Sequence, residues 1–300
     1  MSERRQLAVL LAPYVLGLSL LVAAPALVTF GLSVTEYDLV GAPSFVGLDN
    51  YRELLEDDVF RIAVTNSLVF AAIAVPLRLA AALGLALLLH RRMVGVGVYR
   101  AGVIVPTVIP EIAYGLLWLW LLNPLYGPIN TFLGWGGAPN STWIGYPLPQ
   151  WLTHPNDARA AIVILSLFTI GEGFVILLVT RQGLPAELYD LAAVEDVTAW
   201  GLFRRVTLPL MAPVLVLLLI RDTIFSLQST FVPALVVTDG GPPLYSTTYV
   251  PLFVYRNAFE YLRYGYASAA IVLMLLLTAA AVAVQLWILR RWTRTGRVLG

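Results

Sequence analysis

Five charged side chains lie inside long apolar stretches of the sequence. They are Arg78, Glu111, Glu172, Arg221 and Asp222. Four of them, one in each of four stretches, lie roughly 12–17 Å from the same edge if a helix rises ~1.5 Å per residue. Ionised groups at that depth are costly, and they mark transport pathways or pair with one another. The chemistry predicted here is recognition of a polar solute.

Two of these charges belong to polar faces of predicted helices. The residues at helical spacing on the two faces are Leu165, Thr169 and Glu172 on one, and Asp222, Ser226 and Ser229 on the other. Carboxylates and hydroxyls hydrogen-bond the hydroxyl groups of a sugar, and aromatic rings cover its C–H surface. Trp118, Phe225 and Phe231 are candidates for such rings. These two faces are therefore predicted to bind a polyhydroxylated solute.

A structural role is the alternative for some of the same charges. Arg78 with Glu111 or Glu172 is predicted to form a buried ion pair that fixes the helix bundle. Arg221 is displaced from Asp222 by about 100° around the helix, which assigns it to another surface, such as a contact with a partner subunit.

The elements that must position these residues are membrane spans. The chain has 300 residues, a mean hydropathy of +0.81 and only 12% charged residues, about half of what a soluble protein needs to cover its surface. Six apolar runs reach spanning length: Leu7–Gly31, Asn66–Leu89, Ala101–Leu122, Ala160–Thr180, Ala212–Val232 and Ala267–Leu289. The first run is too long for a signal peptide and lacks a cleavage site, so it is predicted to be a retained helix. The prediction is an all-α polytopic membrane protein, with residues 1–300 as a single transmembrane domain.

Arginine in the loops predicts the orientation. The chain has no lysine, and twelve loop or terminal arginines lie on one side of the predicted membrane against five on the other. The arginine-rich side is the cytoplasmic side in such proteins. Both termini are therefore predicted to be cytoplasmic.

The segment 181–211 is the longest predicted cytoplasmic connection. Pro185 suits a first helical turn, and acidic residues follow it. A second helical run, Trp200–Arg205, precedes Thr207-Leu208-Pro209. The segment is predicted to fold as a helix-turn-helix on the cytoplasmic face.

Several functions are excluded by what the sequence lacks. It has no cysteine, no Gly-x4-Gly-Lys-[Ser/Thr] phosphate-binding loop and no Gly-x-Ser-x-Gly elbow, and His90 and His154 are isolated. No basic run is long enough for nucleic acid. We predict no catalytic residue, no metal site and no cofactor in this chain.

The segment 181–211 also resembles a known motif. The run from Gln182 to Asp196, continued by Val206-Thr207-Leu208-Pro209, resembles the EAA loop of ABC importer permeases. Four further pieces resemble the carbohydrate branch of that family, in order: Phe45–Tyr51, Asn123–Asn130, Thr238–Pro242 and Tyr255–Ala267. The sequence thus resembles the maltose and multiple-sugar permease family over about residues 10–290.

This resemblance implies partners and contacts. The family works with a second permease, an ATPase dimer that binds ATP and magnesium, and an extracytoplasmic substrate-binding protein, in the bacterial inner membrane. Its EAA loop docks on the ATPase, which implies contacts at Asp190, Ala192, Glu195 and Asp196. Its sugar pocket aligns with the two polar faces described above. The external loops, including the Asp239–Pro242 turn, are expected to face the binding protein.

The sequence departs from the motif at two places. Asp190 and Leu191 replace the family's glutamate and first alanine. Glu195-Asp196 replaces its Asp-Gly at the turn between the two short helices, where a positive φ is expected for the glycine. These changes bear on how the loop docks on the ATPase and leave the expected fold unchanged.

Two other functions were weighed. One is a permease of the same family for a polyol, a glycerol-phosphate or a peptide. Glu172 and Asp222 argue against an anionic substrate. The other is an ion-coupled secondary transporter, against which stand the EAA-like loop and the lack of a visible inverted repeat.

Overall fold

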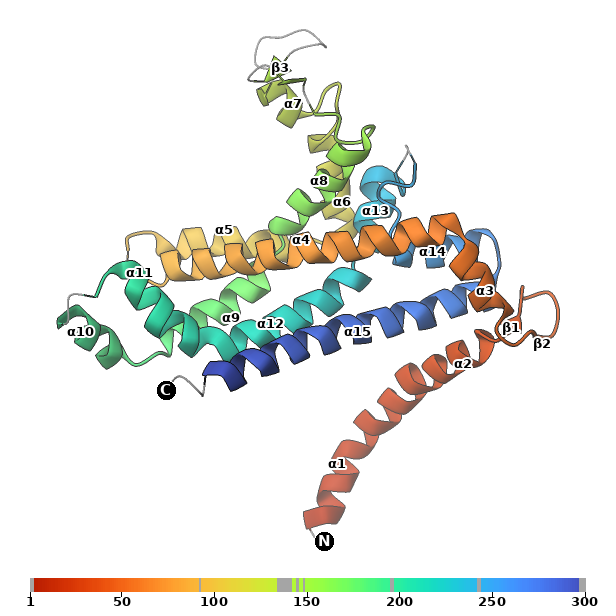
Figure 1. Cartoon of the computed structure of the whole chain (residues 1–300), viewed down its shortest axis with the longest axis horizontal. Helices are drawn as coiled ribbons and strands as arrows, with labels where there is room; N and C mark the ends of the chain where they lie inside the picture. Colours follow the sequence, from red (N-terminus) through yellow and green to blue (C-terminus); the bar gives the residue numbers. More distant parts are fainter. Residues whose placement is uncertain are drawn as a thin grey trace. The chain divides into compact units, whose positions relative to one another are not determined.

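The computed structural model describes residues 3–91, 93–133, 142–143, 146–147, 149–194, 197–241 and 244–296. Within these residues the chain is almost entirely helical (Figure 1). The exceptions are two short antiparallel hairpins, β1 (Thr35–Glu36) with β2 (Ser44–Phe45), and β3 (Thr142–Trp143) with β4 (Tyr146–Pro147). The predicted all-α class is confirmed.

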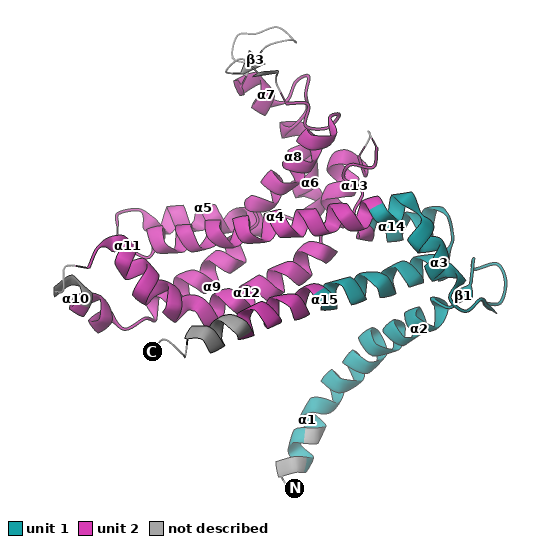
Figure 2. Ribbon diagram, viewed as in Figure 1, with its two compact units in different colours: residues 1–61, 252–280 teal, residues 62–251, 281–300 magenta. Residues whose placement is uncertain are grey.

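The chain divides into two compact units (Figure 2). Unit 1 contains residues 1–61 and 252–280, and unit 2 contains residues 62–251 and 281–300. The helices of unit 1 are α1 (Glu3–Leu18), the π-helical turn η1 (Ser19–Ala23), α2 (Ala24–Leu32), α3 (Asp49–Glu56), the π-helical turn η3 (Arg256–Glu260) and the first part of α15 (Tyr264–Gly296).

Side-chain hydrogen bonds hold unit 1 together where the predicted first external loop lies. Asn50 Nδ2 donates to the carbonyl oxygens of Ser33 at 3.0 Å and Thr35 at 2.9 Å, which anchors α3 to the end of α2. The Tyr266 hydroxyl donates to an Asp57 carboxylate oxygen at 2.7 Å. The two Asn50 bonds give hydrogen-bond donors to backbone carbonyl oxygens at the point where helix α2 ends.

Packing between apolar helix faces forms the core of unit 2. Helix α4 (Asp58–Leu89) belongs to this unit from residue 62 onward. Helices α5 (Val96–Val108) and α12 (Leu208–Gln228) each pack on α9 (Gly171–Gln182). Helix α6 (Glu111–Leu121) packs on α13 (Phe231–Thr238). The remaining helical elements of the unit are α7 (Pro128–Leu133), α8 (Pro155–Leu167), α10 (Ala186–Val194), α11 (Ala199–Leu202), the π-helical turn η2 (Phe203–Thr207) and α14 (Val250–Tyr255), which ends in unit 1. Small residues on α4 allow a tight core against Phe174, Leu177 and Met211.

The predicted number of six spans is matched when each bent helix pair counts as one span. Within the described part of the chain, four helical stretches are long and apolar enough to cross a membrane by themselves: Arg5–Leu32, Asp58–Leu89, Ala199–Gln228 and Tyr264–Arg290. The other two are broken pairs, with α5 and α6 meeting at 103° and α8 and α9 meeting at 44°. Each of the predicted spans 101–122 and 160–180 therefore corresponds to a bent pair of helices in the structure.

The break between α5 and α6 follows from a proline. Pro110 has no backbone N–H to donate, and its ring pushes the preceding residue out of the helical region. Ile109 accordingly has φ −67° and ψ 131°, and Pro110 precedes the first residue of α6. The predicted span 212–232 also contains a helix break, because α12 ends at Gln228 and α13 begins at Phe231.

A glycine allows α9 to start against α5. A Cβ on Gly171 would overlap with Thr107 Oγ1 and would lie 3.0 Å from the Ile104 Cα and 3.1 Å from the Val103 carbonyl oxygen, which is tighter than most side-chain contacts. The Gly171 amide instead donates to Thr107 Oγ1 at 3.2 Å. Since no side chain separates the two helices, the α8–α9 break is held directly against α5.

The segment 181–211 contains two short helices, α10 and α11, followed by η2, which leads into α12. The Tyr189 hydroxyl and Thr207 Oγ1 are 3.1 Å apart, which links α10 to the start of the long helix. Arg181 stacks 4.0 Å above the Tyr189 ring. Glu195 and Asp196 lie outside the described residues, as does the side chain of Ala192, so the helix-turn-helix itself stays a prediction.

Candidate functional site

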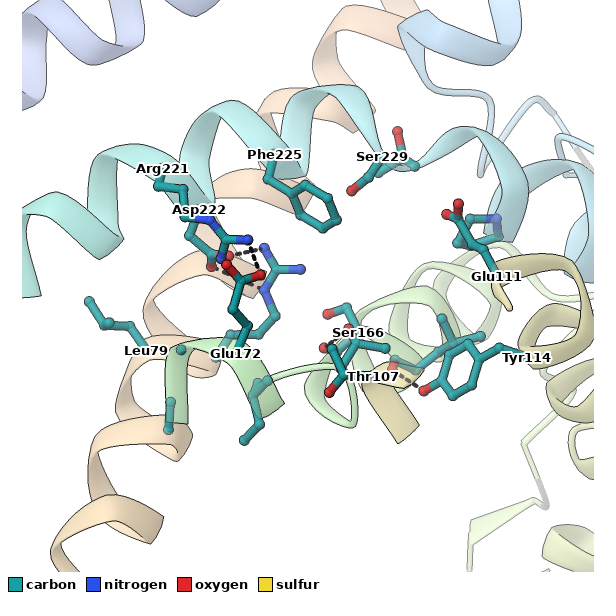
Figure 3. A pocket seen from close by; sticks show the side chains of 18 of the residues that line it. Leu79, Thr107, Glu111, Tyr114, Ser166, Glu172, Arg221, Asp222, Phe225 and Ser229 are labelled. Atoms are coloured by element: carbon teal, nitrogen blue, oxygen red, sulfur yellow. Dashed lines mark hydrogen bonds and ion pairs between the residues drawn. The ribbon is translucent and has the colours of Figure 1, made fainter. Parts of the chain in front are cut away.

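A cavity of about 360 Å³ lies within unit 2. It is bounded by α4, α9, α12 and α13 and by the ends of α5, α6 and α8. Its lining is apolar in part and carries five charged side chains, which are Arg78, Glu111, Glu172, Arg221 and Asp222. The five intramembrane charges predicted from the sequence to be functional or structural thus all reach one cavity (Figure 3).

Arg78 forms a two-contact ion pair with Asp222. Its Nε lies 3.1 Å from Oδ2 of the carboxylate, and an Nη lies 2.9 Å from Oδ1. The guanidinium also donates to the Ser226 hydroxyl, one turn further along α12. Arg78 is only 6% exposed, so these contacts with Asp222 and Ser226 compensate a charge that is buried in the apolar bundle.

Arg221 forms a second ion pair, with Glu172 at the start of α9. This pair is more open than the first, with side-chain exposures of 43% for Arg221 and 57% for Glu172. The Arg221 guanidinium also lies 5.8 Å from the centre of the Phe225 ring. The two ion pairs link α4, α9 and α12 around the same cavity.

The structure corrects two predictions about these charges. Arg78 pairs with Asp222, not with Glu111 or Glu172, and Arg221 lines the cavity rather than another surface. The long arginine side chain explains the second result, because its stem bends around the helix and brings the guanidinium to a face that its Cα does not occupy. Glu111 has no hydrogen-bond or ion-pair partner among the described residues.

Five of the six predicted solute-binding residues line the cavity, which are Leu165, Thr169, Glu172, Asp222 and Ser229. Ser226 does not; it is fully buried and is held by Arg78. Phe225 is the one predicted aromatic residue on the wall, since Trp118 is buried elsewhere and Phe231 does not line the cavity. Whether these residues bind solute stays a prediction.

Sequence reasoning missed Tyr114 and Thr230 on the cavity wall. The Tyr114 hydroxyl donates to the Leu165 carbonyl at 2.7 Å, near the end of α8. Thr230 is 2% exposed, and its hydroxyl has no hydrogen-bond partner. The signal that would have found Thr230 is Ser229 beside it, because Thr230 directly continues the polar positions Ser226, Gln228 and Ser229.

Three helix breaks border the cavity. They are the α5–α6 break at Ile109, the α8–α9 break at Thr169 and Ile170, and the α12–α13 break at Ser229 and Thr230. Backbone groups left without helical partners are tolerated at membrane depth where they line a cavity or are buried in protein. Broken helices around a polar midplane cavity are typical of membrane transport proteins.

The fold and cavity therefore define the class: a polytopic membrane protein that handles a polar solute. Residues 78–294 match the family described as the binding-protein-dependent transport system inner membrane component, and the chain belongs to this family. It is a permease subunit of the ABC importers, which confirms the resemblance found in the sequence.

Individual relatives match nearly the whole chain. It is 31% identical over 297 residues to the sulfoquinovosyl glycerol transport system permease protein SmoG of Agrobacterium fabrum, covering 97% of this chain and 92% of that protein. It is 31% identical over 264 residues to the trehalose/maltose transport system permease protein MalF of Thermococcus litoralis, covering 87% and 86%. A chain in the crystal structure of a bacterial alginate ABC transporter, in complex with an alginate pentasaccharide-bound periplasmic protein, has the same fold with a TM-score of 0.80 at 21% identity, covering 96% and 95%.

Proposed function

We propose that this chain forms half of the translocation pore of an ATP-driven importer and passes a carbohydrate through the cavity in unit 2. The observation that carries the proposal is the cavity itself, where polar side chains and three helix breaks meet inside apolar spans. Two relatives named for transport of sulfoquinovosyl glycerol and of trehalose/maltose support the substrate class. Uptake of radiolabelled sugars by cells with and without an intact gene for this chain tests the proposal.

The proposed complex has further subunits. The sequence contains no phosphate-binding loop, so ATP and magnesium are assigned to a separate ATPase dimer. One chain offers one cytoplasmic docking segment, whereas a two-fold ATPase dimer needs two. A second permease supplies the other segment and the other half of the pore, and an extracytoplasmic binding protein delivers the sugar.

A topology experiment tests the proposed orientation. Reporter fusions after Leu55 and Gln150 are expected to give extracytoplasmic signals, and a fusion after His90 a cytoplasmic one, because the arginine-rich loops face the cytoplasm. Paired reporters, one active on each side of the membrane, serve as mutual controls at each position. An extracytoplasmic signal at His90 would rule out cytoplasmic termini.

A charge reversal tests the proposed coupling helix α10. Asp190 is exposed on this helix and is free to meet a basic cleft of the ATPase. We expect Asp190→Arg to lower import and substrate-stimulated ATP hydrolysis at least ~10-fold, since like charges across a desolvated contact cost several kcal/mol. The chain should remain in the membrane at its normal amount.

Asp190→Asn is the matched control, because it removes the charge without reversing it. It should lower both rates less than the arginine variant does. Normal import and ATP hydrolysis in Asp190→Arg would mean that α10 does not dock through this face.

A further inference from the structure

We propose that the ends of α4 and α9 and the start of α5 form a binding site for the headgroup phosphate of an anionic phospholipid, and that Arg91, Arg100 and Arg181 are its cations. These helix ends lie on the predicted cytoplasmic side of unit 2. The inference goes beyond the proposed function, because none of the three arginines lines the cavity and the site does not depend on which solute is carried.

Apolar packing brings the three helix ends together. Leu89 ends α4, Val96 begins α5 and Leu178 lies near the end of α9, and all three pack in one apolar cluster. Arg100 Nε and Nη2 donate to the Leu89 carbonyl oxygen at 3.1 and 2.7 Å. Since a carbonyl in the last turn of a helix has no N–H partner within that helix, the guanidinium satisfies it and is itself fixed at the end of α4.

The side chain of His90, which directly follows α4, lies among the arginine charges. Its Nδ1 is 2.6 Å from the Leu87 carbonyl oxygen. Burial lowers the pKa of His90, and the hydrogen bond to Leu87 acts in the other direction. Three positive charges close enough to act on the imidazole lower its pKa further, those of Arg181, Arg91 and Arg100. Among the described residues no carboxylate acts on the imidazole, so these four side chains form a basic cluster.

The positive charges of the basic cluster are not balanced within the described part of the chain. None of its three arginines forms an ion pair there. Arg181 lies 4.0 Å above the centre of the Tyr189 ring, a contact that orients the guanidinium without neutralising it. Like charges held close together repel one another, and a bound anion removes that repulsion. Guanidinium groups match the geometry of phosphate oxygens, so a phosphate group is the ligand that the basic cluster fits.

The position of the basic cluster favours a lipid phosphate over a soluble one. Predicted spans end or begin at Leu89, Ala101 and Thr180, and each of these residues directly adjoins a member of the cluster. The cluster therefore lies at the edge of the hydrocarbon core, where the lipid headgroups are. The same helix ends and the turn between α4 and α5 carry exposed apolar side chains, which are Leu88, Val94, Val98 and Tyr99. Basic sites between helices on the cytoplasmic side bind anionic headgroups, and the apolar side chains add contacts for acyl chains, which free phosphate lacks.

The complete transporter, purified in a neutral detergent, is used to test the site. Native mass spectrometry during titration with phosphatidylglycerol gives the affinity of the most tightly bound lipid, and phosphatidylcholine is the neutral comparison. The test variant combines Arg91→Gln with Arg181→Gln. Arg100 is kept because it satisfies the Leu89 carbonyl, and Arg92, which lies outside the described residues, is also kept.

We expect the double glutamine variant to bind phosphatidylglycerol about 10- to 30-fold more weakly, because each basic residue beside the membrane surface contributes about 5-fold. Binding of phosphatidylcholine, which carries no net charge, should stay the same. The charge-preserving variant Arg91→Lys with Arg181→Lys should keep most of the affinity, which separates loss of charge from loss of packing.

A second pair of arginines controls for the loss of net charge. Arg204 and Arg205 are exposed on η2, and neither acts on the His90 imidazole. The variant Arg204→Gln with Arg205→Gln removes the same charge from the same predicted side of the membrane. It should leave the affinity for phosphatidylglycerol unchanged.

Four results would overturn the lipid site. The first is a double glutamine variant that binds phosphatidylglycerol as tightly as the wild type, and the second is an equal loss of affinity in the Arg204 and Arg205 control. The third is displacement of the lipid by inorganic phosphate at equal concentration, which would assign the basic cluster to a soluble anion. The fourth is loss of the ATPase subunit from the glutamine variant with lipid binding unchanged, which would identify the cluster as a contact with that partner. Sugar uptake tests the proposed function separately, so a transporter that imports sugar without these lipid effects contradicts only this inference.

Discussion

Arg78→Ala should remove most of the folded subunit from the membrane. The substitution leaves the Asp222 carboxylate and the Ser226 hydroxyl without the guanidinium that satisfies both. Breaking a buried ion pair from one side typically costs ~3–5 kcal/mol, which is comparable to the whole stability margin of many proteins. The amount of monodisperse chain extracted from membranes and its thermal stability measure the effect.

Asp222→Ala should lose folded subunit in the same way, because it leaves Arg78 as an unpaired charge. The sequence pattern had predicted a solute-binding role for Asp222 instead. The double variant Arg78→Met with Asp222→Leu should recover much of the folded chain, since two apolar side chains of similar volume often replace a buried ion pair without loss of stability.

The more open Arg221–Glu172 pair provides the matched comparison. Arg221→Met should change the amount of folded chain little, because ion pairs that remain accessible contribute only ~0–1 kcal/mol. If Arg78→Ala accumulated as well as Arg221→Met, or if the double variant were no better than Arg78→Ala, the Arg78–Asp222 pair would not stabilise the fold.

Gly241→Ala is expected to have the second large effect. Gly241 has φ +81°, a conformation that costs a residue with a Cβ ~1–2 kcal/mol. The added carbon would also lie 2.6 Å from both N and Oγ1 of Thr247 and 2.8 Å from Ser246 Oγ. Both neighbours are completely buried, so the overlap adds a further ~1–3 kcal/mol.

The loop has little room to adjust. Asn66 Nδ2 donates to the carbonyl oxygens of Tyr245 at 2.9 Å and Thr248 at 3.0 Å, and these bonds hold the loop on α4. We expect Gly241→Ala to lower the thermal stability and the amount of folded chain strongly. Gly95→Ala is the control, because Gly95 has φ +76° but no atom within 4 Å of the added carbon. Equal stability of the two variants would show that the contacts with Ser246 and Thr247 are not restrictive.

The position of this loop, but not its burial, could be predicted from the sequence. Thr238–Pro242 was recognised as part of a family pattern and was expected to face the binding protein. Asp239 is exposed and Gly240 and Gly241 are buried, while the next described residues, Leu244 and Tyr245, are exposed. That the turn faces the binding protein stays a prediction. The motif located the turn, but motif spacing does not report which side of a turn packs inward.

The sequence by itself determined the class of protein, located the apolar runs and showed that four of these runs contain charged residues. These properties follow from local quantities: the length of an apolar run, the rise per helical residue and the cost of a charge in lipid. Pro110 could also have predicted the break before α6, although not its angle of 103°.

Only the tertiary structure decided which charges pair. Arg78, Glu172 and Asp222 lie at similar depth on separate helices, and nothing in their spacing ranks one partner above another. Helix rotation and packing bring Asp222 and Ser226 to Arg78, turn the Arg221 guanidinium to Glu172 and leave Glu111 without a partner among the described residues. Because pairing depends on ångström-scale distances between helices far apart in the chain, it emerges only when the bundle is assembled.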